Sequence, residues 1–306
     1  MFMKVDLVVV GSDGRVGKEL IRFFTPLIRV KGINHYEMDL LNIDQIRDKL
    51  ESLDYRYILL SAALTDVDFC ENNPELAYRV NRDAAEVISF ISRKKNAIVI
   101  YLSTDMVFEG LQGSPYHETH PTDPVNVYGW SKLSGEQAVI SNSAANLILR
   151  VSWLYGPSRS SFPNWVIHQS CIRSSIAIPD DKVACPTYVP DLVSWVNTLC
   201  FQRSGIPLAG VYHLCNQGAC SWREWAQACI DIAKTVDIPV RVERVDSCAL
   251  DSVGELQARR PKNSALCTDK FSCHCGVVPR GWRLALEDFV IQNRDTLLEE
   301  ALGPSR

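Results

Sequence analysis

The sequence predicts an α/β protein that combines a doubly wound parallel sheet with a smaller C-terminal lobe. Two observations predict this fold. In the first 155 residues, short apolar runs alternate with segments whose apolar residues have the spacing of a helix. The apolar runs are nearly continuous, which is typical of strands buried on both faces of a parallel sheet. A strand–helix alternation of this kind indicates consecutive βαβ units.

The expected elements follow one another in a regular order. Apolar runs predict strands at residues 5–10, 27–31, 57–60, 97–102 and 147–151. Helical spacing predicts helices at residues 16–24, 43–53, 81–93 and 128–141. After Trp153 the pattern loosens into turns, and helices return at residues 191–201, 221–233 and 282–298. Ser221, with Glu224 three residues later, predicts a capping box at the second of these.

These elements divide into two parts. We expect residues 1–155 to form the sheet domain and a later stretch, about residues 186–215, to return to it. Residues 156–306 are expected to form mainly the second lobe.

Composition and charge exclude several classes of protein. The net charge is −4 and no stretch is rich in Lys and Arg, which argues against a nucleic-acid partner. Residues 1–10 are too short and too soon interrupted for a signal peptide, and no apolar stretch is long enough for a membrane helix. We therefore expect a cytoplasmic protein with no membrane partner. Its 11 cysteines are expected to be thiols, and because Cys273-His274-Cys275 lacks the two-residue spacing of common zinc sites, no metal is expected.

A glycine-rich loop follows the first expected strand directly and opens the first expected helix. It reads G-x-x-G-x-x-G, a variant of the dinucleotide fingerprint of the Rossmann fold, in which glycines let the backbone approach a pyrophosphate. The helix N-terminus adds a favourable field for the phosphates. A purely structural turn is the alternative, but the position after a Val-rich strand favours a cofactor. The candidate cofactor residues in this loop are Gly11, Asp13, Gly14, Arg15, Val16 and Gly17.

The stretch that follows the first helix bears on the choice between NADPH and NADH. An NAD site usually has an acidic residue about 20 residues after the glycines. Here the expected second strand offers Arg29 and Lys31 instead, and Arg15 lies in the loop itself. Cations suit a 2′-phosphate, so NADPH is the expected cofactor and NADH the alternative. The other interpretation is that these are ordinary solvated charges.

The second chemical motif is Tyr128-x-x-x-Lys132. Four residues apart on a helix, the two side chains share a face. We expect the Lys132 cation to lower the pKa of Tyr128 and make it a competent general acid. A bare Y-x-x-x-K arises often by chance, but here it follows Ser103-Thr104, which end an expected buried strand. Ligand sites in such sheets form at the carboxyl ends of strands.

With these motifs the chain resembles a known family, the dTDP-4-dehydrorhamnose reductases, which are extended short-chain dehydrogenases. The resemblance runs almost end to end. It is carried by the glycine loop, Asp39-Leu40, residues 61–68, Val80-Asn81, residues 103–110, residues 115–118, residues 128–136, residues 150–156, Pro186-Thr187, Asp191-Leu192, residues 210–213 and residues 260–264.

The resemblance implies a set of site residues and a reaction. Thr104, Tyr128 and Lys132 would form the catalytic set. Gly14, Arg15 and Val16 would contact the cofactor pyrophosphate. Beyond the loop, the cofactor would meet Asp39, Leu40, Ala62, Ala63, Thr65, Tyr128 and Lys132. The sugar nucleotide would touch Thr104, Asp105 and Trp153. The implied reaction is the NADPH-dependent reduction of the C4 keto group of a nucleotide-linked 4-keto-6-deoxy sugar in deoxysugar biosynthesis, with a homodimer as a further expectation.

The chain also departs from the family pattern. Ser61 and Leu64 replace the usual residues at two positions, and Met106 replaces a tyrosine near the expected sugar site. Three alternatives therefore stay open. The protein could be a sugar-nucleotide epimerase or a dehydratase, although a 4,6-dehydratase normally has Asp-Glu after the catalytic Thr. It could also be a non-catalytic subunit that binds NADP, like the regulatory subunit of methionine adenosyltransferase.

Overall fold

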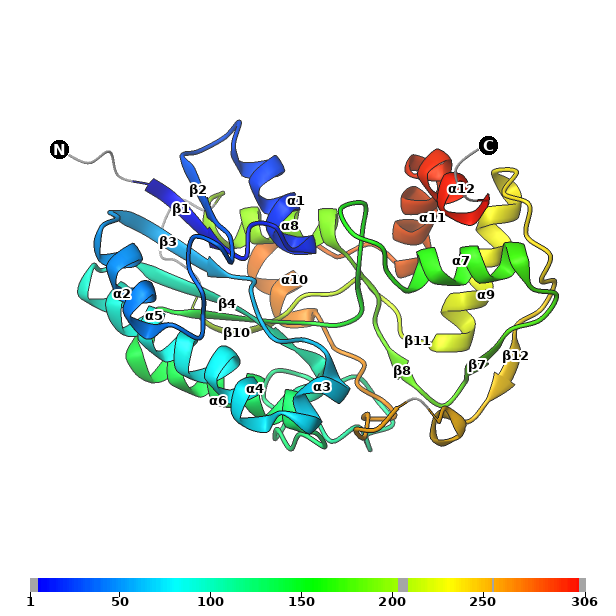
Figure 1. Cartoon of the computed structure of the whole chain (residues 1–306), viewed down its shortest axis with the longest axis horizontal. Helices are drawn as coiled ribbons and strands as arrows, with labels where there is room; N and C mark the ends of the chain where they lie inside the picture. The colour runs from blue at the N-terminus through cyan, green and yellow to red at the C-terminus, as the bar shows by residue number, and fades with distance from the viewer. Residues whose placement is uncertain (1–4, 203–208, 255, 303–306) are drawn as a thin grey trace.

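The computed structural model of the protein describes residues 5–202, 209–254 and 256–302. Within these ranges it confirms the predicted α/β class, with helices on both faces of a six-stranded sheet (Figure 1). The strands run in the order β10-β5-β4-β3-β1-β2, and every neighbouring pair is parallel. Their bounds are β1 Val5–Val10, β2 Val30–Ile33, β3 Tyr55–Leu60, β4 Ile98–Thr104, β5 Leu147–Val151 and β10 Gly210–His213. Residues 1–4, part of the segment considered as a signal peptide, lie outside the described residues.

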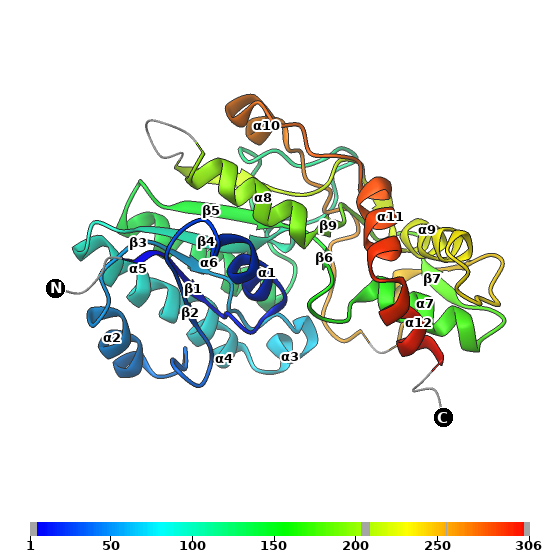
Figure 2. The same cartoon turned by 90° about the horizontal axis from the view of Figure 1, so that it is seen from above.

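Both faces of the sheet are buried, as the continuous apolar runs predicted. In β1, Leu7 and Val9 join one apolar cluster and Val8 joins the other, so successive side chains enter opposite layers. The first layer is covered by α1 (Arg15–Phe24), α8 (Val189–Cys200) and α10 (Asp269–Cys275), which Figure 2 shows on one side of the sheet. The second layer is covered by α2 (Ile43–Glu51), α5 (Ala84–Lys94) and α6 (Val127–Asn142).

The order of the strands creates a switch point beside β1. The chain passes from β1 to β2 at one edge and then returns to β3 on the other side of β1. In such sheets a ligand binds outside the carboxyl ends of the strands at the point where the order reverses. Here Gly11 follows β1, and Ser61 and Ala62 follow β3, with their N–H groups donating to the Val10 carbonyl at 3.1 Å.

The second strand, predicted at residues 27–31, begins three residues later, at Val30. Leu27 and Ile28 look like part of a strand, but both donate backbone N–H bonds to the Phe24 carbonyl and so belong to the turn that ends α1. Leu27 is 59% exposed. An apolar run therefore misplaced the strand, because the run contains surface residues of a turn as well as strand residues.

Between β3 and β4 the chain forms more helix than predicted. The expected helix at residues 81–93 is preceded by α3 (Val67–Asn72) and α4 (Pro74–Tyr78), and a π-helical turn (Arg79–Asp83) joins α4 to α5. The described chain also contains two 3₁₀ turns, Asp105–Val107 and Leu250–Ser252.

The second lobe has its own apolar core, to which residues between Tyr155 and Ala301 contribute (Figure 1). Its helices are α7 (Phe162–Ile172), α9 (Trp222–Thr235), α11 (Trp282–Gln292) and α12 (Arg294–Leu302). The last two replace the single helix predicted at residues 282–298. Three strand pairs accompany them: β6 (Leu154–Tyr155) with β9 (Thr187–Tyr188), β7 (Ala177–Pro179) with β12 (Asp246–Cys248), and β8 (Val183–Ala184) with β11 (Cys220–Ser221).

The start of α9 shows how the sequence sets these helices. The Glu224 N–H donates to Ser221 Oγ at 3.1 Å, and the Ser221 N–H donates to Glu224 Oε2 at 2.8 Å, which confirms the predicted capping box. In the described part of the chain, no helix combines the length and the apolar character needed to cross a membrane.

Candidate active site

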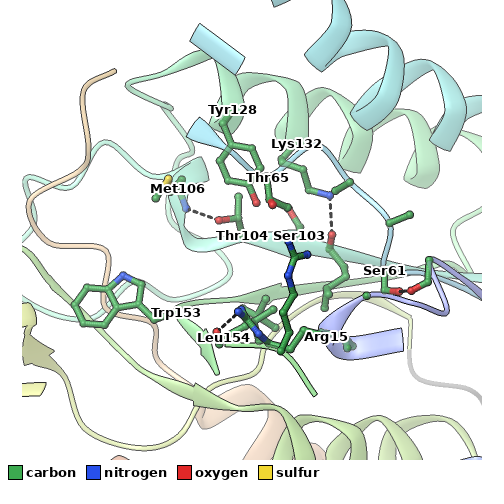
Figure 3. Close-up of a pocket in the computed structure, with 18 of the residues that line it drawn as sticks. Arg15, Ser61, Thr65, Ser103, Thr104, Met106, Tyr128, Lys132, Trp153 and Leu154 are labelled. Carbon is green, nitrogen blue, oxygen red and sulfur yellow. Dashed lines mark hydrogen bonds between the residues drawn. The ribbon is translucent and has the colours of Figure 1, made fainter. Parts of the chain in front are cut away.

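A cavity of about 710 Å³ opens at the switch point, between the sheet and the second lobe (Figure 3). Its walls come from the segments that follow β1, β3, β4 and β5, and from the first turns of α6. Most of the residues selected from the sequence line it together: Gly11, Asp13, Gly14, Arg15, Val16, Ala62, Ala63, Thr65, Thr104, Asp105, Tyr128, Lys132 and Trp153.

Steric limits explain the glycines of the first loop. Gly11 has φ +86°, and a Cβ there would lie 2.7 Å from the Ala62 nitrogen. A Cβ on Gly17 would lie 2.0 Å from the Gly11 carbonyl oxygen, so Gly17 is required for packing and does not itself line the cavity. Gly14 is the N-cap of α1 and supplies no side-chain cap. The first N–H groups of α1 are therefore left for a ligand, and a helix N-terminus favours an anionic one.

Arg15 joins this loop to the segment that follows β5. Its guanidinium donates to the carbonyls of Leu154 and Ser160, both at 2.7 Å. Within the described residues its buried Nε has no hydrogen-bond partner. Arg159 and His35 line the same cavity, so three basic side chains lie there in addition to Lys132. Such a set suits a ligand that carries several phosphates.

Thr104, Tyr128 and Lys132 meet on the opposite wall. Figure 3 shows Tyr128 and Lys132 extending from α6 toward the end of β4, where Thr104 lies. Tyr128 is hydrogen-bonded to Thr104, and Lys132 Nζ donates to the Leu102 carbonyl at 2.7 Å. Lys132 Nζ also lies 3.9 Å from the centre of the Tyr101 ring.

Local sequence explains why α6 comes so close to β4. Asn126 caps the helix by accepting the Gly129 N–H at 2.8 Å. Gly129 is needed because a Cβ there would lie 2.2 Å from the Met106 carbonyl oxygen. The backbone of α6 therefore rests on the segment after Thr104, and the first two turns of the helix bring Tyr128 and Lys132 to the cavity.

A buried ion pair holds the same helix against the sheet. Glu136, one turn after Lys132, accepts two hydrogen bonds from Arg150 of β5, at 2.7 and 2.9 Å, and one from Ser103 of β4 at 2.5 Å. The side chains of Arg150 and Glu136 are only 5% and 3% exposed. Since breaking one half of a buried pair leaves an uncompensated charge, this contact fixes α6 firmly.

Burial controls the ionisation of the Tyr–Lys pair. It raises the pKa of Tyr128, and the hydrogen bond between Tyr128 and Thr104 opposes this effect only in part. Burial lowers the pKa of Lys132 to about 7, against the opposing charge of Glu136. The pKa of Tyr128 is therefore raised rather than lowered in the protein without ligands, because loss of water around the phenol is the largest effect on it. The expected effect of the Lys132 cation on this pKa stays a prediction.

Trp153 lies on the far side of the cavity from Tyr128. Its backbone has φ +42°, a region that bulky residues seldom adopt, and its indole is stacked on Trp225 at 5.3 Å. Strain of this kind persists where surrounding contacts over-determine the conformation. The stack therefore ties the second lobe to a side chain that lines the cavity.

Comparison with known proteins now identifies the family. A family model described as the RmlD substrate binding domain matches residues 3–294. The chain belongs to this family. The curated relatives include a dTDP-4-dehydrorhamnose reductase of Escherichia coli (strain K12), which is 30% identical over 92% of this chain and 96% of its own length. A dTDP-4-dehydrorhamnose reductase of Streptomyces griseus is 31% identical over 92% of this chain and 91% of the relative's own length.

Solved structures agree with this membership of the RmlD substrate binding domain family. A dTDP-4-dehydrorhamnose reductase from Bacillus anthracis, crystallised in complex with NADP, is 31% identical and superposes with a TM-score of 0.87. The alignment covers 95% of this chain and all of the other. A UDP-glucose 4-epimerase from Thermotoga maritima has a TM-score of 0.79 at 18% identity, over 96% of this chain and all of that one, which shows the shared fold alone.

For this family member, the structure corrects the placement of two predicted cofactor residues. Arg29 lies at the amino end of β2, away from the cavity, and its side chain contacts Asp6 at 3.3 Å. Lys31 lies within β2 and pairs with Glu37 at 2.9 Å, which helps to lower the pKa of Glu37 to about 2. Arg29 and Lys31 were misplaced because β2 begins at Val30, later than predicted. The basic residue that follows the carboxyl end of β2 is therefore His35.

Two further residues that were predicted to bind the cofactor, Asp39 and Leu40, do not line the cavity. Leu40 is buried in the apolar layer under β1 and β3. The Asp39 carboxylate accepts the Leu41 N–H at 2.9 Å and lies 3.9 Å from His35 Nδ1. The sequence reasoning missed His35, Arg159 and Ser160 as lining residues. Residues 158–161 read only as a turn, and no motif marked His35.

The cysteines, and the one group of side chains that could bind a metal in the described part of the chain, do not line the cavity. Each of the 11 cysteines is a thiol rather than half of a disulfide. One group of three potential ligands occurs among the described residues, formed by His117, Cys267 and Asp269 within 4.8 Å of one another. None of the three lines the cavity.

Proposed function

We propose that the protein uses NADPH to reduce the C4 keto group of dTDP-4-dehydrorhamnose to give dTDP-rhamnose. The observation that carries this proposal is the cavity that a dinucleotide-type glycine loop shares with Thr104, Tyr128 and Lys132. The relatives named dTDP-4-dehydrorhamnose reductase support the substrate, and the relative crystallised with NADP supports the cofactor. A homodimer and a cytoplasmic location remain predictions from the sequence.

The first half of the cavity fits a dinucleotide. Gly11 and Gly17 have no room for a Cβ, the N-terminus of α1 has no side-chain cap, and Arg15 Nε has no partner in the described chain. We assign the pyrophosphate to the loop from Gly11 to Gly17 and the adenosine end to the region beside His35. When bound, the cofactor supplies the hydride, and the protein supplies orientation and electrostatics.

The second half supplies a proton donor and a carbonyl ligand. The Thr104 hydroxyl, which donates to Asp105 Oδ1 in the structure, would turn to donate to the keto oxygen, and Tyr128 would protonate that oxygen as negative charge develops on it. Tyr128 is protonated at neutral pH, as a donor must be, and because its pKa is raised, the phenolate that it leaves behind needs stabilisation from its neighbours. Lys132 would hold the nicotinamide ribose and stabilise the phenolate that Tyr128 leaves behind. Asp105 and Trp153 would bind the sugar nucleotide.

We expect NADPH to be preferred over NADH, because the cavity has three basic side chains, Arg15, Arg159 and His35, near the loop. The specificity constant should be at least about tenfold higher for NADPH, which corresponds to about 1.4 kcal/mol. The measurement is kcat/KM for each cofactor at a fixed sugar-nucleotide concentration. A tenfold preference for NADH would contradict this assignment of the phosphate-binding residues.

The substrate assignment is tested with a panel of 4-keto-6-deoxy sugars linked to dTDP, UDP and GDP. NADPH consumption is followed by its absorbance. The dTDP-linked sugar should give the highest kcat/KM. Consumption that is highest with another nucleotide would retain the reductase and reject dTDP, whereas no consumption with any sugar would reject the proposed reaction.

A further inference from the structure

A lysine of the second lobe is buried directly behind the sugar end of the cavity. Lys182 lies between β7 and β8 and is 0% exposed. It does not line the cavity, and no step of the proposed reaction uses it. Burial lowers its pKa to about 8, and the nearby Asp105 carboxylate opposes this effect. A buried ammonium is costly unless its hydrogens are bonded, so its contacts indicate its purpose.

Those contacts form a chain that ends at the cavity. Lys182 Nζ donates to Ser264 Oγ at 3.0 Å and to the Pro261 carbonyl at 2.5 Å. Ser264 Oγ in turn donates to Asp105 Oδ2 at 2.5 Å. Asp105 lines the cavity although it is only 2% exposed, and its other oxygen, Oδ1, accepts the Thr104 hydroxyl at 3.2 Å. The chain therefore connects Lys182 with Thr104, the hydrogen-bond partner of Tyr128.

The direction of this chain follows from the donors available. An ammonium only donates, so Ser264 Oγ must accept from Lys182. The single hydroxyl hydrogen of Ser264 is then committed to Asp105, because a carboxylate only accepts. Ser152 Oγ donates to the same Oδ2 at 3.0 Å. Two donors thus bind Oδ2, and Oδ1 accepts from Thr104, which lines the cavity together with Asp105.

We propose that Lys182 is a positioning residue for sugar-nucleotide binding, which acts through Ser264 to hold Asp105 in the orientation that accepts a sugar hydroxyl. This inference rests on the proposed function. It assigns Lys182 no contact with the substrate. In this role residue 182 acts as a hydrogen-bond donor to Ser264, although its ammonium also lies 5.9 Å from the centre of the Trp153 ring. A glutamine should therefore replace it, because its amide also donates, whereas a methionine of similar length should not.

The test compares Lys182→Met, Lys182→Gln and Ser264→Ala in the full chain. Because Asp105 would no longer be held in one orientation, Lys182→Met and Ser264→Ala should each raise the sugar-nucleotide KM about tenfold. The KM for NADPH should not change, since the glycine loop is untouched. Lys182→Gln should retain a sugar-nucleotide KM within about threefold of the wild type. If Lys182→Met does not fold, Ser264→Ala tests the same link from its other end.

Lys262→Met is the matched control, because Lys262 is an exposed lysine that pairs with Asp181 at 3.0 Å on the surface. It should leave both KM values unchanged. The positioning role would be overturned if Lys182→Met raised the KM values for sugar nucleotide and NADPH equally. It would also be overturned if Lys182→Gln raised the sugar-nucleotide KM as much as Lys182→Met does.

Direct binding separates this inference from the proposed reaction. The Kd of dTDP-rhamnose, measured by calorimetry on wild type and Lys182→Met, should rise about tenfold in the variant. If the wild type reduces no sugar nucleotide, the proposed reaction fails, and this Kd still tests the role of Lys182. An unchanged Kd would reject that role even if the reductase activity were present.

Discussion

Tyr128→Phe is expected to lower kcat by about 10² to 10⁴, the usual range for loss of a general acid. The substitution keeps the ring and removes only the hydroxyl that is hydrogen-bonded to Thr104. NADPH affinity should be retained, because the glycine loop and Lys132 are unchanged. The measurement is the steady-state rate of NADPH oxidation at saturating sugar nucleotide, together with the Kd of NADPH by fluorescence.

Tyr55→Phe is the matched control for this loss. Tyr55 is also buried and hydrogen-bonded through its hydroxyl, to Ser92 at 3.0 Å, but it is the first residue of β3 and does not line the cavity. Its kcat should equal that of the wild type. Near-normal turnover in Tyr128→Phe would show that another group donates the proton.

Lys132→Met should weaken cofactor binding as well as slow turnover. Lys132 Nζ is buried beside the cavity, and in the proposed reaction it binds the nicotinamide ribose and stabilises the Tyr128 phenolate. A hydrogen bond from a charged group is worth about 1.5 to 3 kcal/mol, so the NADPH Kd should rise about 10- to 100-fold. We expect kcat to fall by at least about 10².

The two substitutions therefore differ in the binding measurement. Lys94→Met, which alters an exposed lysine of α5, should change neither constant. If Lys132→Met lowered kcat but left the NADPH Kd unchanged, the ribose contact would be wrong and Lys132 would act on Tyr128 alone.

The sequence predicted the parts of the fold that depend on local signals. The valines of β1 and the glycines that follow correctly placed a tight loop at the end of the first strand, because the strand run and the steric need for Gly11 and Gly17 are both local. The Tyr128-to-Lys132 spacing identified one face of α6 for the same reason. The second strand was misplaced because Leu27 is apolar yet exposed, and periodicity does not distinguish the two environments.

Contacts between distant segments were beyond the reach of local patterns. Lys182 and Ser264 are 82 positions apart, and Asp105 is 159 positions from Ser264, so only the folded chain brings the three together. The raised pKa of Tyr128 has the same origin, because desolvation depends on everything packed around the phenol. His35 was missed since its position follows from the true end of β2.

Transfer of deuterium is the most direct test of the central claim, that this cavity delivers a hydride to the sugar C4. The protein is incubated with dTDP-4-dehydrorhamnose and NADPH labelled at the transferred position of the nicotinamide. We predict a dTDP-rhamnose product that is heavier by one mass unit, with the label at C4 in its NMR spectrum, and an equal amount of NADP⁺. An unlabelled product, or conversion of the sugar with no net oxidation of NADPH, would contradict the account.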